Sequence, residues 1–338
     1  MPRYSRRDAR VTAAASSPAW ERDASLSLAP LGERVARDGV FTSRRGTGEG
    51  VRPEAQPRST MHNIYQPDLM KVIETRRQTP DVKSVKVRFL DEVKAKDFSF
   101  HVGQFGIFSV FGYGESTFNI CSSSNWKDYI EFCFRKVGCV TEALWSVEEG
   151  DVIGFRGPYG NFYPMDDGGK GKNLIFLGGG IAMPPVRCAV WYALENRADY
   201  GNITIVYGAR TVADLVYVDE LDEWAKHPSV RVVRCVDPGG QTPDWTGEIG
   251  FVPTVFERAG VPAENSVALV IGPPIMIKNT IPVLYRMGIK PGVVYTSLEN
   301  RMKCGVGKCG RCNVGSFYVC KEGPILTMEQ LEHLPADY

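Results

Sequence analysis

The sequence lacks the features of a membrane protein or a nucleic-acid-binding protein. No apolar run in the 338 residues approaches the roughly 20 residues that a membrane-spanning helix needs. The formal net charge is only +1, so no field of one sign draws in nucleic acid or an anionic surface. With 43% hydrophobic and 23% charged residues, the composition predicts a globular protein with neither kind of partner.

A secretory signal is also absent, because no charged start followed by an apolar core is visible. The nine cysteines are an odd number, which does not suit a complete disulfide framework. We therefore expect a cytoplasmic protein, where thiols stay reduced. In that compartment, cysteines that lie close together in the sequence indicate metal binding.

Lysine is missing from residues 1–60, which contain eleven Arg and seven acidic residues. No amphipathic period is visible there. The segment is typical of a disordered extension or of a region translated from an early start codon. A mitochondrial transit peptide would also be rich in Arg and Ser, but the acidic residues argue against it. We expect the folded protein to begin near Met61.

Residues 61–168 have the pattern of a β domain, because short runs rich in Val, Ile and Phe are separated by Gly, Pro or Asp. The expected strands are 70–77, 84–90, 97–102, 107–112 and 129–136, with one short helix at 141–147. Several short strands without helices between them predict a closed β-barrel or a sandwich.

Strands and helices alternate over residues 169–298. The expected strands are 173–180, 202–208, 229–236, 266–272 and 293–298, and the expected helices are 184–198, 219–226, 251–260 and 275–288. This alternation predicts βαβ units and a parallel sheet. The tail over residues 299–338 is rich in Cys and Gly and is too short for a hydrophobic core of its own.

Three turns of the α/β domain contain glycine at the end of an expected strand. The candidate nucleotide-binding residues are Gly178, Gly179, Gly180, Ile181 and Ala182; Tyr207, Gly208, Ala209 and Arg210; and Gly272, Pro273, Pro274 and Met276. In a parallel sheet these turns share the carboxyl edge, where glycine lets the backbone approach a pyrophosphate. The spacing is not G-x-G-x-x-G, so the first turn alone is equally compatible with a tight turn that binds nothing.

Two segments of the β domain could also bind a ligand. FNICSSS (118–124) is a polar run directly after a strand-like segment, and RKVGCVTEAL (135–144) places Gly138 and Thr141 at the start of a short helix. Backbone N–H groups at such a helix start could bind a phosphate. Taken alone, each segment is more typical of an ordinary turn.

Four cysteines near the C-terminus have the spacing C-x4-C-x2-C-x7-C. They are Cys304, Cys309, Cys312 and Cys320, with glycines at 305, 307 and 310 between the first three. The C-x4-C-x2-C half matches the plant-type ferredoxin spacing for a [2Fe–2S] cluster, whereas zinc ribbons usually pair two C-x2-C knuckles. The spacing predicts a [2Fe–2S] cluster, with structural zinc and free thiols as the alternatives.

The order of a β domain, a nucleotide-type α/β domain and a four-cysteine tail resembles the ferredoxin-NADP reductase superfamily. The likeness is greatest to the electron-transfer subunits of cytoplasmic sulfhydrogenase, anaerobic sulfite reductase and dihydroorotate dehydrogenase, and it covers residues 66–338. It rests on GQF (103–105), GESTFNICSSS (114–124), GCVTEAL (138–144), GDVIGFRGPYGNFYP (150–164), LGGGIAMPPVR (177–187), YGAR (207–210), GPPIMIK (272–278) and the cysteine tail.

The resemblance implies that the β-barrel holds FAD, although FMN is not excluded. The segment along the isoalloxazine would be Phe118, Asn119, Ile120, Cys121 and Ser122, and the segment at the flavin phosphates would be Val137, Gly138, Val140 and Thr141. Many members of the superfamily have an Arg as phosphate partner two residues before the aromatic, where this chain has Ser116. The glycine turns match the NAD(P) site. Arg210 could meet a 2′-phosphate, whereas Asp214 could favour a 2′-hydroxyl.

The resemblance also implies the function: an electron-transfer subunit that takes hydride from NAD(P)H onto FAD and passes single electrons through the cluster. Its partner would be a hydrogenase- or reductase-type subunit, and the short x7 gap suits the hydrogenase and sulfite-reductase branch. Two alternatives are a stand-alone NAD(P)H reductase that uses ferredoxin, and a non-enzymatic scaffold with structural zinc. No acid–base constellation stands out among the four histidines, so we expect no catalytic side chain of that kind.

Overall fold

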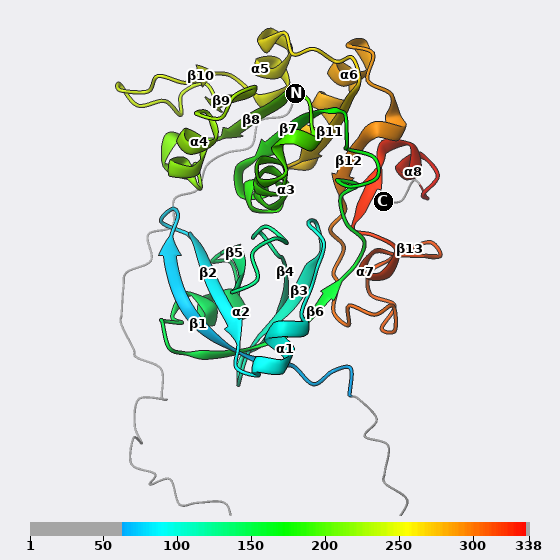
Figure 1. Ribbon diagram of the computed structural model, residues 1–338. Coiled ribbons are helices and arrows are strands. Elements are labelled where there is room, and N and C mark those ends of the chain that lie inside the picture. The colour runs from blue at the N-terminus through cyan, green and yellow to red at the C-terminus, as the bar shows by residue number, and fades with distance from the viewer. Residues whose placement is uncertain (1–62, 336–338) are drawn as a thin grey trace, which may run out of the picture. The chain divides into compact units, whose positions relative to one another are not determined.

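The computed structural model describes residues 63–335, which belong to one compact unit, Met61–Tyr338 (Figure 1). The extension expected over residues 1–60 and the expected start at Met61 lie outside the described residues. Within the described range, no helix is long and apolar enough to cross a membrane.

A six-stranded antiparallel sheet forms the N-terminal part of the described chain (Figure 1). Its strands are β1 (Asp68–Arg77), β2 (Val82–Phe89), β3 (Phe105–Val110), β4 (Gly114–Asn119), β5 (Ile130–Arg135) and β6 (Val152–Tyr159), in the order β4-β3-β6-β1-β2-β5. The sheet curls until its edge strands β4 and β5 meet through Phe118 and Phe132, whose ring centroids lie 5.6 Å apart. Aromatic packing, rather than a hydrogen-bonded ladder, therefore joins the two edges of the predicted barrel.

Two short helices accompany this sheet, α1 (Glu92–Asp97) and α2 (Cys139–Trp145). Helix α2 corresponds to the helix predicted at 141–147. The strand predicted at 97–102 is wrong, because Asp97 is the last residue of α1 and residues 98–102 pair with no strand. The alternation of apolar and polar residues that suggested a strand has another cause. The ring centroids of Phe98 and Phe155 lie 5.8 Å apart in the barrel core, and Phe100 is buried in the same core.

A seven-stranded sheet follows in the order β10-β9-β8-β7-β11-β12-β15. Its strands are β7 (Asn173–Gly179), β8 (Ile203–Ala209), β9 (Val230–Val236), β10 (Glu248–Ile249), β11 (Ser266–Ile271), β12 (Val294–Ser297) and β15 (Ile325–Thr327). All neighbours are parallel except β12 and β15. From β7 the strand order runs outward through β8 and β9 on one side and through β11 and β12 on the other. The order therefore reverses between β7 and β11, and open α/β sheets bind ligands at the carboxyl ends of the strands at such a point.

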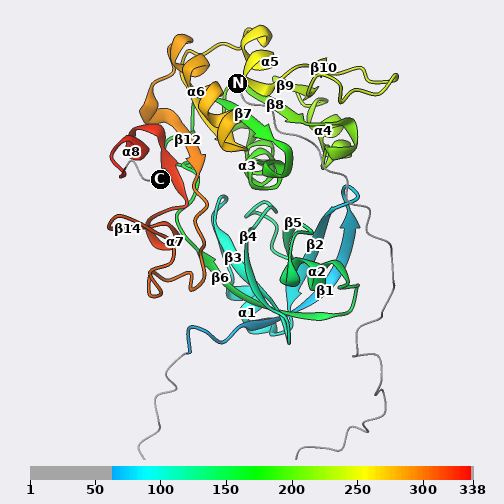
Figure 2. The same ribbon diagram turned by 180° about the vertical axis from the view of Figure 1, so that it is seen from behind.

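Helices cover both faces of this sheet (Figures 1 and 2). The α-helices are α3 (Met183–Glu195), α4 (Val218–Trp224), α5 (Val252–Ala259) and α6 (Pro274–Arg286), and the 3-10 turns are η1 (Gly180–Ala182), η2 (Arg197–Asp199), η3 (Val212–Asp214) and η4 (Pro291–Val293). Along β7, Leu174 and Phe176 pack with α3 and α4, while Ile175 and Leu177 pack with α5 and α6. A strand buried on both faces explains the continuous apolar run that predicted it.

The cysteine tail contains β13 (Asn313–Val314), β14 (Phe317–Tyr318), α7 (Val319–Glu322) and α8 (Met328–Glu332), as well as β15. It shares a small core with the barrel, in which Phe105 of β3 packs with Leu298, Val319 and Leu326. The tail thus obtains its apolar contacts from both larger sheets.

Candidate functional site

The structure brings the three predicted glycine turns to one edge of the parallel sheet. Gly178 of β7 pairs with Tyr207 of β8 on one side and with Ile271 of β11 on the other. Gly179 pairs with Gly208, one residue further along. The turns after β7, β8 and β11 therefore lie side by side at the carboxyl edge, next to the start of α3.

Gly179 and Gly272 lie next to each other, and a Cβ on either one would crowd the side chain of Met276. A Cβ on Gly179 would lie 2.5 Å from Sδ of Met276, and a Cβ on Gly272 would lie 2.7 Å from the same sulfur. Met276 is itself buried beneath the two turns. The helices that follow begin with prolines, which have no N–H (Pro184 and Pro185 in α3, Pro274 in α6). The donors that a pyrophosphate could approach are therefore the backbone N–H groups of the glycine turns themselves.

The other predicted nucleotide contacts differ in exposure. Tyr207 is fully buried and its hydroxyl donates to the Gly180 carbonyl at 3.0 Å, so this side chain supports the first turn from below. Arg210 is exposed at the end of β8. Asp214 accepts from the backbone and hydroxyl of Thr211 at 3.1 and 2.8 Å, which commits its carboxylate to a local turn. Ile181, Ala182 and Gly180 are half-buried, Ala209 is buried, and Pro273 and Pro274 are exposed.

The first segment implied for the flavin lies on β4 and directly after it. Phe118 and Asn119 are half-buried. Ile120, Cys121 and Ser122 are fully buried, and Ser122 Oγ accepts from the Glu131 N–H at 3.1 Å. The side chains of these last three residues are therefore part of the core, and a ligand could meet only their backbone.

The second segment implied for the flavin forms the start of α2. Val137 and Gly138 are exposed, Val140 is half-buried and Thr141 is buried. The Thr141 hydroxyl oxygen accepts from the N–H groups of Val137 and Gly138, both at 2.9 Å. Those two donors are thus already used inside the turn.

A polar cleft of about 410 Å³ lies between β4 and the chain that leads from β12 to the first tail cysteine. Ser116, Thr117 and Asn119 line one side, and the stretch from Ser297 to Lys303 lines the other, with Phe105, Arg311 and Pro324 completing the wall. Its size is in the range of small-molecule sites. We take it as the candidate site next to the flavin segment.

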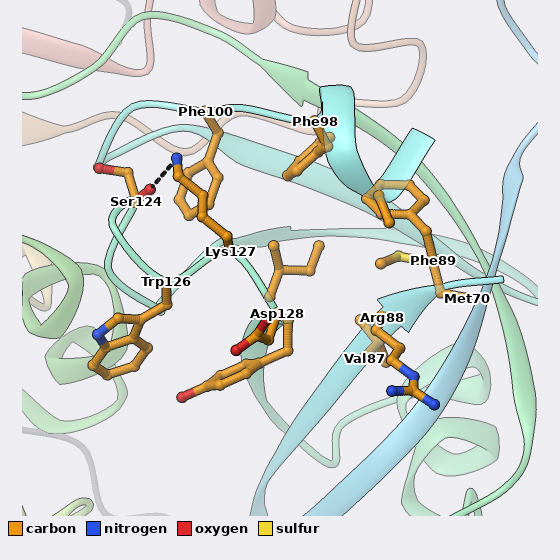
Figure 3. Close-up of a pocket in the computed structure, with 13 residues that line it drawn as sticks. Met70, Val87, Arg88, Phe89, Phe98, Phe100, Ser124, Trp126, Lys127 and Asp128 are labelled. Atoms are coloured by element: carbon orange, nitrogen blue, oxygen red, sulfur yellow. Dashed lines mark hydrogen bonds between the residues drawn. The ribbon is translucent and has the colours of Figure 1, made fainter. Parts of the chain in front are cut away.

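A second hollow beside α1 is much smaller (Figure 3). Met70, Phe89, Phe98 and Phe100 supply most of its apolar wall, and the Lys127 ammonium donates to the Ser124 carbonyl at 2.9 Å across its opening. Its volume of about 20 Å³ suits about one water molecule, so it is no nucleotide site.

The four tail cysteines lie in one loop-rich segment. Cys304, Cys312 and Cys320 are buried, Cys309 is exposed, and all four are free thiols. Gly305, Gly307 and Gly310 have φ values of 77°, 70° and 67°. This left-handed conformation suits glycine and turns backbone N–H groups toward sulfur.

Those N–H groups donate to the cysteine sulfurs. Sγ of Cys304 accepts from Lys308 and Cys309 at 3.2 and 3.4 Å, and Sγ of Cys320 accepts from Gly307 at 3.2 Å. Burial by itself would raise the pKa of Cys304, but the backbone N–H groups of Val306, Cys309 and Lys308 lower it to about 6. A thiolate with such donors is the form that ligates metal.

The thiols are arranged in two contacting pairs, Cys304 with Cys309 and Cys312 with Cys320. Between residues 63 and 335, no three His, Cys, Asp or Glu side chains converge as the ligands of one ion would. A [2Fe–2S] cluster has two irons, and four cysteines give each iron two ligands. Two pairs of sulfurs therefore fit such a cluster.

Comparisons with known proteins agree with this geometry. The family model of the oxidoreductase NAD-binding domain matches residues 176–281, and that of the iron–sulfur cluster binding domain of dihydroorotate dehydrogenase B matches residues 299–332. Sulfhydrogenase 2 subunit gamma of Pyrococcus furiosus is 37% identical over 280 residues, which cover 78% of this chain and 96% of that protein. The chain belongs to the ferredoxin-NADP reductase superfamily.

Further relatives lie in the same superfamily. The probable dihydroorotate dehydrogenase B electron transfer subunit of Methanocaldococcus jannaschii is 29% identical over 275 residues, covering 80% of this chain and 93% of that protein. The solved structure of an NADH-dependent reduced ferredoxin-NADP oxidoreductase matches the fold with a TM-score of 0.63 at 22% identity, covering 79% of this chain and 90% of that one. The predicted family and fold class are confirmed, and the chain contains an oxidoreductase NAD-binding domain followed by an iron–sulfur cluster binding domain.

In this chain, one stripe of α3 joins the nucleotide edge to the flavin segment. Arg187, Trp191 and Glu195 recur every four residues, so they share one helix face. Glu195 accepts from Ser123 Oγ at 2.5 Å and from Asn125 Nδ2 at 3.0 Å, just beyond the segment on β4. The helix that begins at the glycine turn is therefore held to the barrel along its length.

Arg187 is the centre of a buried charge network between the sheets. Its guanidinium lies 3.1 Å from Glu131 Oε2 of β5, forms two bonds of 2.6 and 2.7 Å to Glu220 of α4, and donates to the Cys121 carbonyl at 2.8 Å. Burial alone would lower the pKa of Arg187, but Glu131, Tyr217 and Glu220 raise it well above its ordinary value. Burial likewise raises the pKa of the Cys121 thiol well above its usual range.

Sequence reasoning missed the cleft residues from Ser297 to Lys303, together with Arg187, Glu131 and Glu220. Arg187 ends the landmark LGGGIAMPPVR (177–187), but that motif indicates no role for its side chain, and no motif marks the other residues. The partners of Arg187 are far away in the chain. The one available signal was the absence of an Arg at Ser116, which the structure places in the wall of the cleft.

Proposed function

We propose that this chain is an electron-transfer subunit that exchanges a hydride with NAD(P)H and single electrons with a partner redox subunit through a [2Fe–2S] cluster. The observation that carries the proposal is the polar cleft, since β4 forms one wall and the chain entering Cys304 forms the other. When bound, FAD supplies the conversion between two-electron and one-electron chemistry.

Each part of the chain has a distinct task in this proposal. The turns after β7, β8 and β11 bind the pyrophosphate of the nucleotide at the start of α3. The stripe on α3 holds that edge against the barrel, which fixes the nicotinamide relative to the residues around β4. The tail cysteines bind the cluster; backbone N–H groups lower the pKa of Cys304 to about 6, whereas burial and the neighbouring Cys312 raise the pKa of Cys320 to about 12.

Cys309 marks the side on which electrons leave or enter. It is the exposed one of the four cysteines. The surrounding residues 300–321 include five Lys or Arg and no acidic residue, and these five cations are exposed. A hydrogenase- or reductase-type subunit with an acidic face fits this surface, as the gamma subunits related to this chain assemble by name with other subunits. A cytoplasmic location belongs to the proposal, because free cysteines suit a reducing compartment.

The test is anaerobic purification from the native cell, followed by identification of the co-purifying proteins and a visible spectrum. We expect a stable complex with a redox subunit, flavin bands at about 450 nm that bleach with NAD(P)H, and iron–sulfur absorption. A monomer with full physiological activity toward soluble ferredoxin would favour the stand-alone reductase. A colourless protein would contradict both.

A further inference from the structure

The segment GDVIGFRGPYGNFYP (150–164) is a landmark of the superfamily, but the function described above gives it no task. In the structure, the cysteine segment packs against β6 and the loop that follows it. Three side chains of this stretch, those of Arg156, Tyr159 and Asn161, contact three different parts of the tail.

Arg156 contacts the cluster segment directly at its first cysteine. Its side chain is 3% exposed, and Nη1 donates to the Cys304 carbonyl at 3.2 Å. Nη2 lies 2.7 Å from Oε1 of Glu115 on β4, whose side chain is 38% exposed. One buried guanidinium thus joins a residue of the flavin-side strand to the backbone of a cluster cysteine.

The neighbouring residues fix this arrangement. A Cβ on Gly305 would lie 2.4 Å from the ring of Tyr159, so the chain after Cys304 packs directly on that ring. Asn161 donates to the Ile325 carbonyl at 2.6 Å and accepts from the Ile325 N–H at 2.8 Å, which anchors the tail after its last cysteine. The position of Cys304 relative to Arg156 is therefore set from both ends of the segment.

We propose that Arg156 is a positioning residue that holds the cluster segment against β4 and, with Glu115, sets the reduction potential of the cluster. This inference rests on the proposed [2Fe–2S] site, and it assigns to two residues outside that site the control of how electrons divide between flavin and cluster.

The direction in which each residue shifts the reduction potential of the cluster follows from its charge. Reduction adds one negative charge to the cluster, so a nearby buried cation favours the reduced state and a nearby anion opposes it. Arg156 is almost fully buried, whereas Glu115 is partly in solvent and its charge is better screened. The pair therefore acts with a net positive influence, and either partner alone shifts the potential in its own direction.

The experiment compares five variants of the full chain by anaerobic redox titration, with EPR for the cluster and absorbance for the flavin. Arg156→Gln lowers the cluster potential and Glu115→Gln raises it, each changing the flavin-to-cluster electron ratio by about tenfold, or about 59 mV for one electron. Arg156→Lys keeps the charge and stays within about threefold of the wild type. The double variant Arg156→Gln/Glu115→Gln lies between the two single ones.

Arg135 supplies the control, because it forms an ion pair of 3.1 Å with Asp81 on the same barrel and has no hydrogen bond or ion pair to the described residues of the tail. Arg135→Gln leaves the cluster potential unchanged. The inference is overturned if Arg156→Gln and Glu115→Gln shift the potential in the same direction, or if neither moves it beyond the control. Should Arg156→Gln fail to fold, Glu115→Gln and Arg156→Lys decide, because their changes leave the buried cation in place. A wild-type protein without a cluster signal would instead sink the proposed function and the inference with it.

Discussion

Replacing Arg187 by Met tests the claim that buried charges hold the two sheets together. The change removes a guanidinium whose side chain is 4% exposed and leaves Glu131, at 2% exposed, buried without its cation. Breaking a buried ion pair by removing one partner costs about 3–5 kcal/mol, because the remaining charge stays desolvated. For a protein of this size the urea m-value is about 3 kcal/mol/M, so the unfolding midpoint falls by about 1 to 1.7 M.

The assay is urea unfolding of the full chain followed by tryptophan fluorescence. Arg258→Met is the matched control, since Arg258 lies 3.0 Å from Glu248 with both side chains about half exposed. Exposed pairs contribute about 0–1 kcal/mol, so this variant shifts the midpoint little. Adding Glu131→Gln to Arg187→Met recovers part of the loss, because the fully buried carboxylate is neutralised and only the more exposed Glu220 is left without its cation. Equal midpoint shifts for Arg187→Met and Arg258→Met would refute the reasoning.

Three further outcomes are expected. Gly179→Val raises the KM for NAD(P)H at least about tenfold at unchanged flavin content, because its side chain fills the backbone approach beside Met276; an unchanged KM would contradict the assignment of this edge. Cys309→Ala abolishes the cluster EPR signal but leaves flavin reduction by NAD(P)H largely intact, and loss of flavin would count against separate sites. The free energy of unfolding falls as pH rises from 9 toward 12, because burial raises the folded pKa of Cys133 and Cys188 to about 12 from 9.0, so only the unfolded thiols ionise in that window. Cys188→Ala, measured across the same pH range, should flatten this slope.

Much of the α/β domain could be predicted because strands and helices alternate regularly along the chain. Strands such as β7 are buried on both faces and read as continuous apolar runs between helices. The β domain was harder. DFSFHV (97–102) has the alternation of a strand, yet its phenylalanines enter the core from irregular chain after α1. Alternation reports which side chains are buried, and it does not report whether the backbone finds a partner strand.

Some residues of the candidate site could likewise be predicted from the sequence, and others could not. The glycine turns and the cysteines were predictable because backbone approach and metal ligation require particular residues at short spacing. The contacts of Arg156 and Arg187 were not predictable. Arg156 donates to the carbonyl of Cys304, 148 residues away in the chain, and Arg187 donates to the carbonyl of Cys121, 66 residues away. Contacts of this kind depend on how two domains pack, and a single sequence has no local pattern that records it.

The pairing of β12 with β15 has a consequence for how the redox centre is built into the chain. Ser297 and Ile325 are antiparallel partners, so residues 298–324 leave the sheet and return to the place they left. Antiparallel partners lie about 5 Å apart, a gap that a tight hairpin turn closes. The cysteine segment is thus an insertion between two paired strands, β12 and β15, at one edge of the nucleotide-binding sheet. Its loss or exchange would leave the strand order of that sheet unchanged, but it would remove one wall of the cleft beside β4.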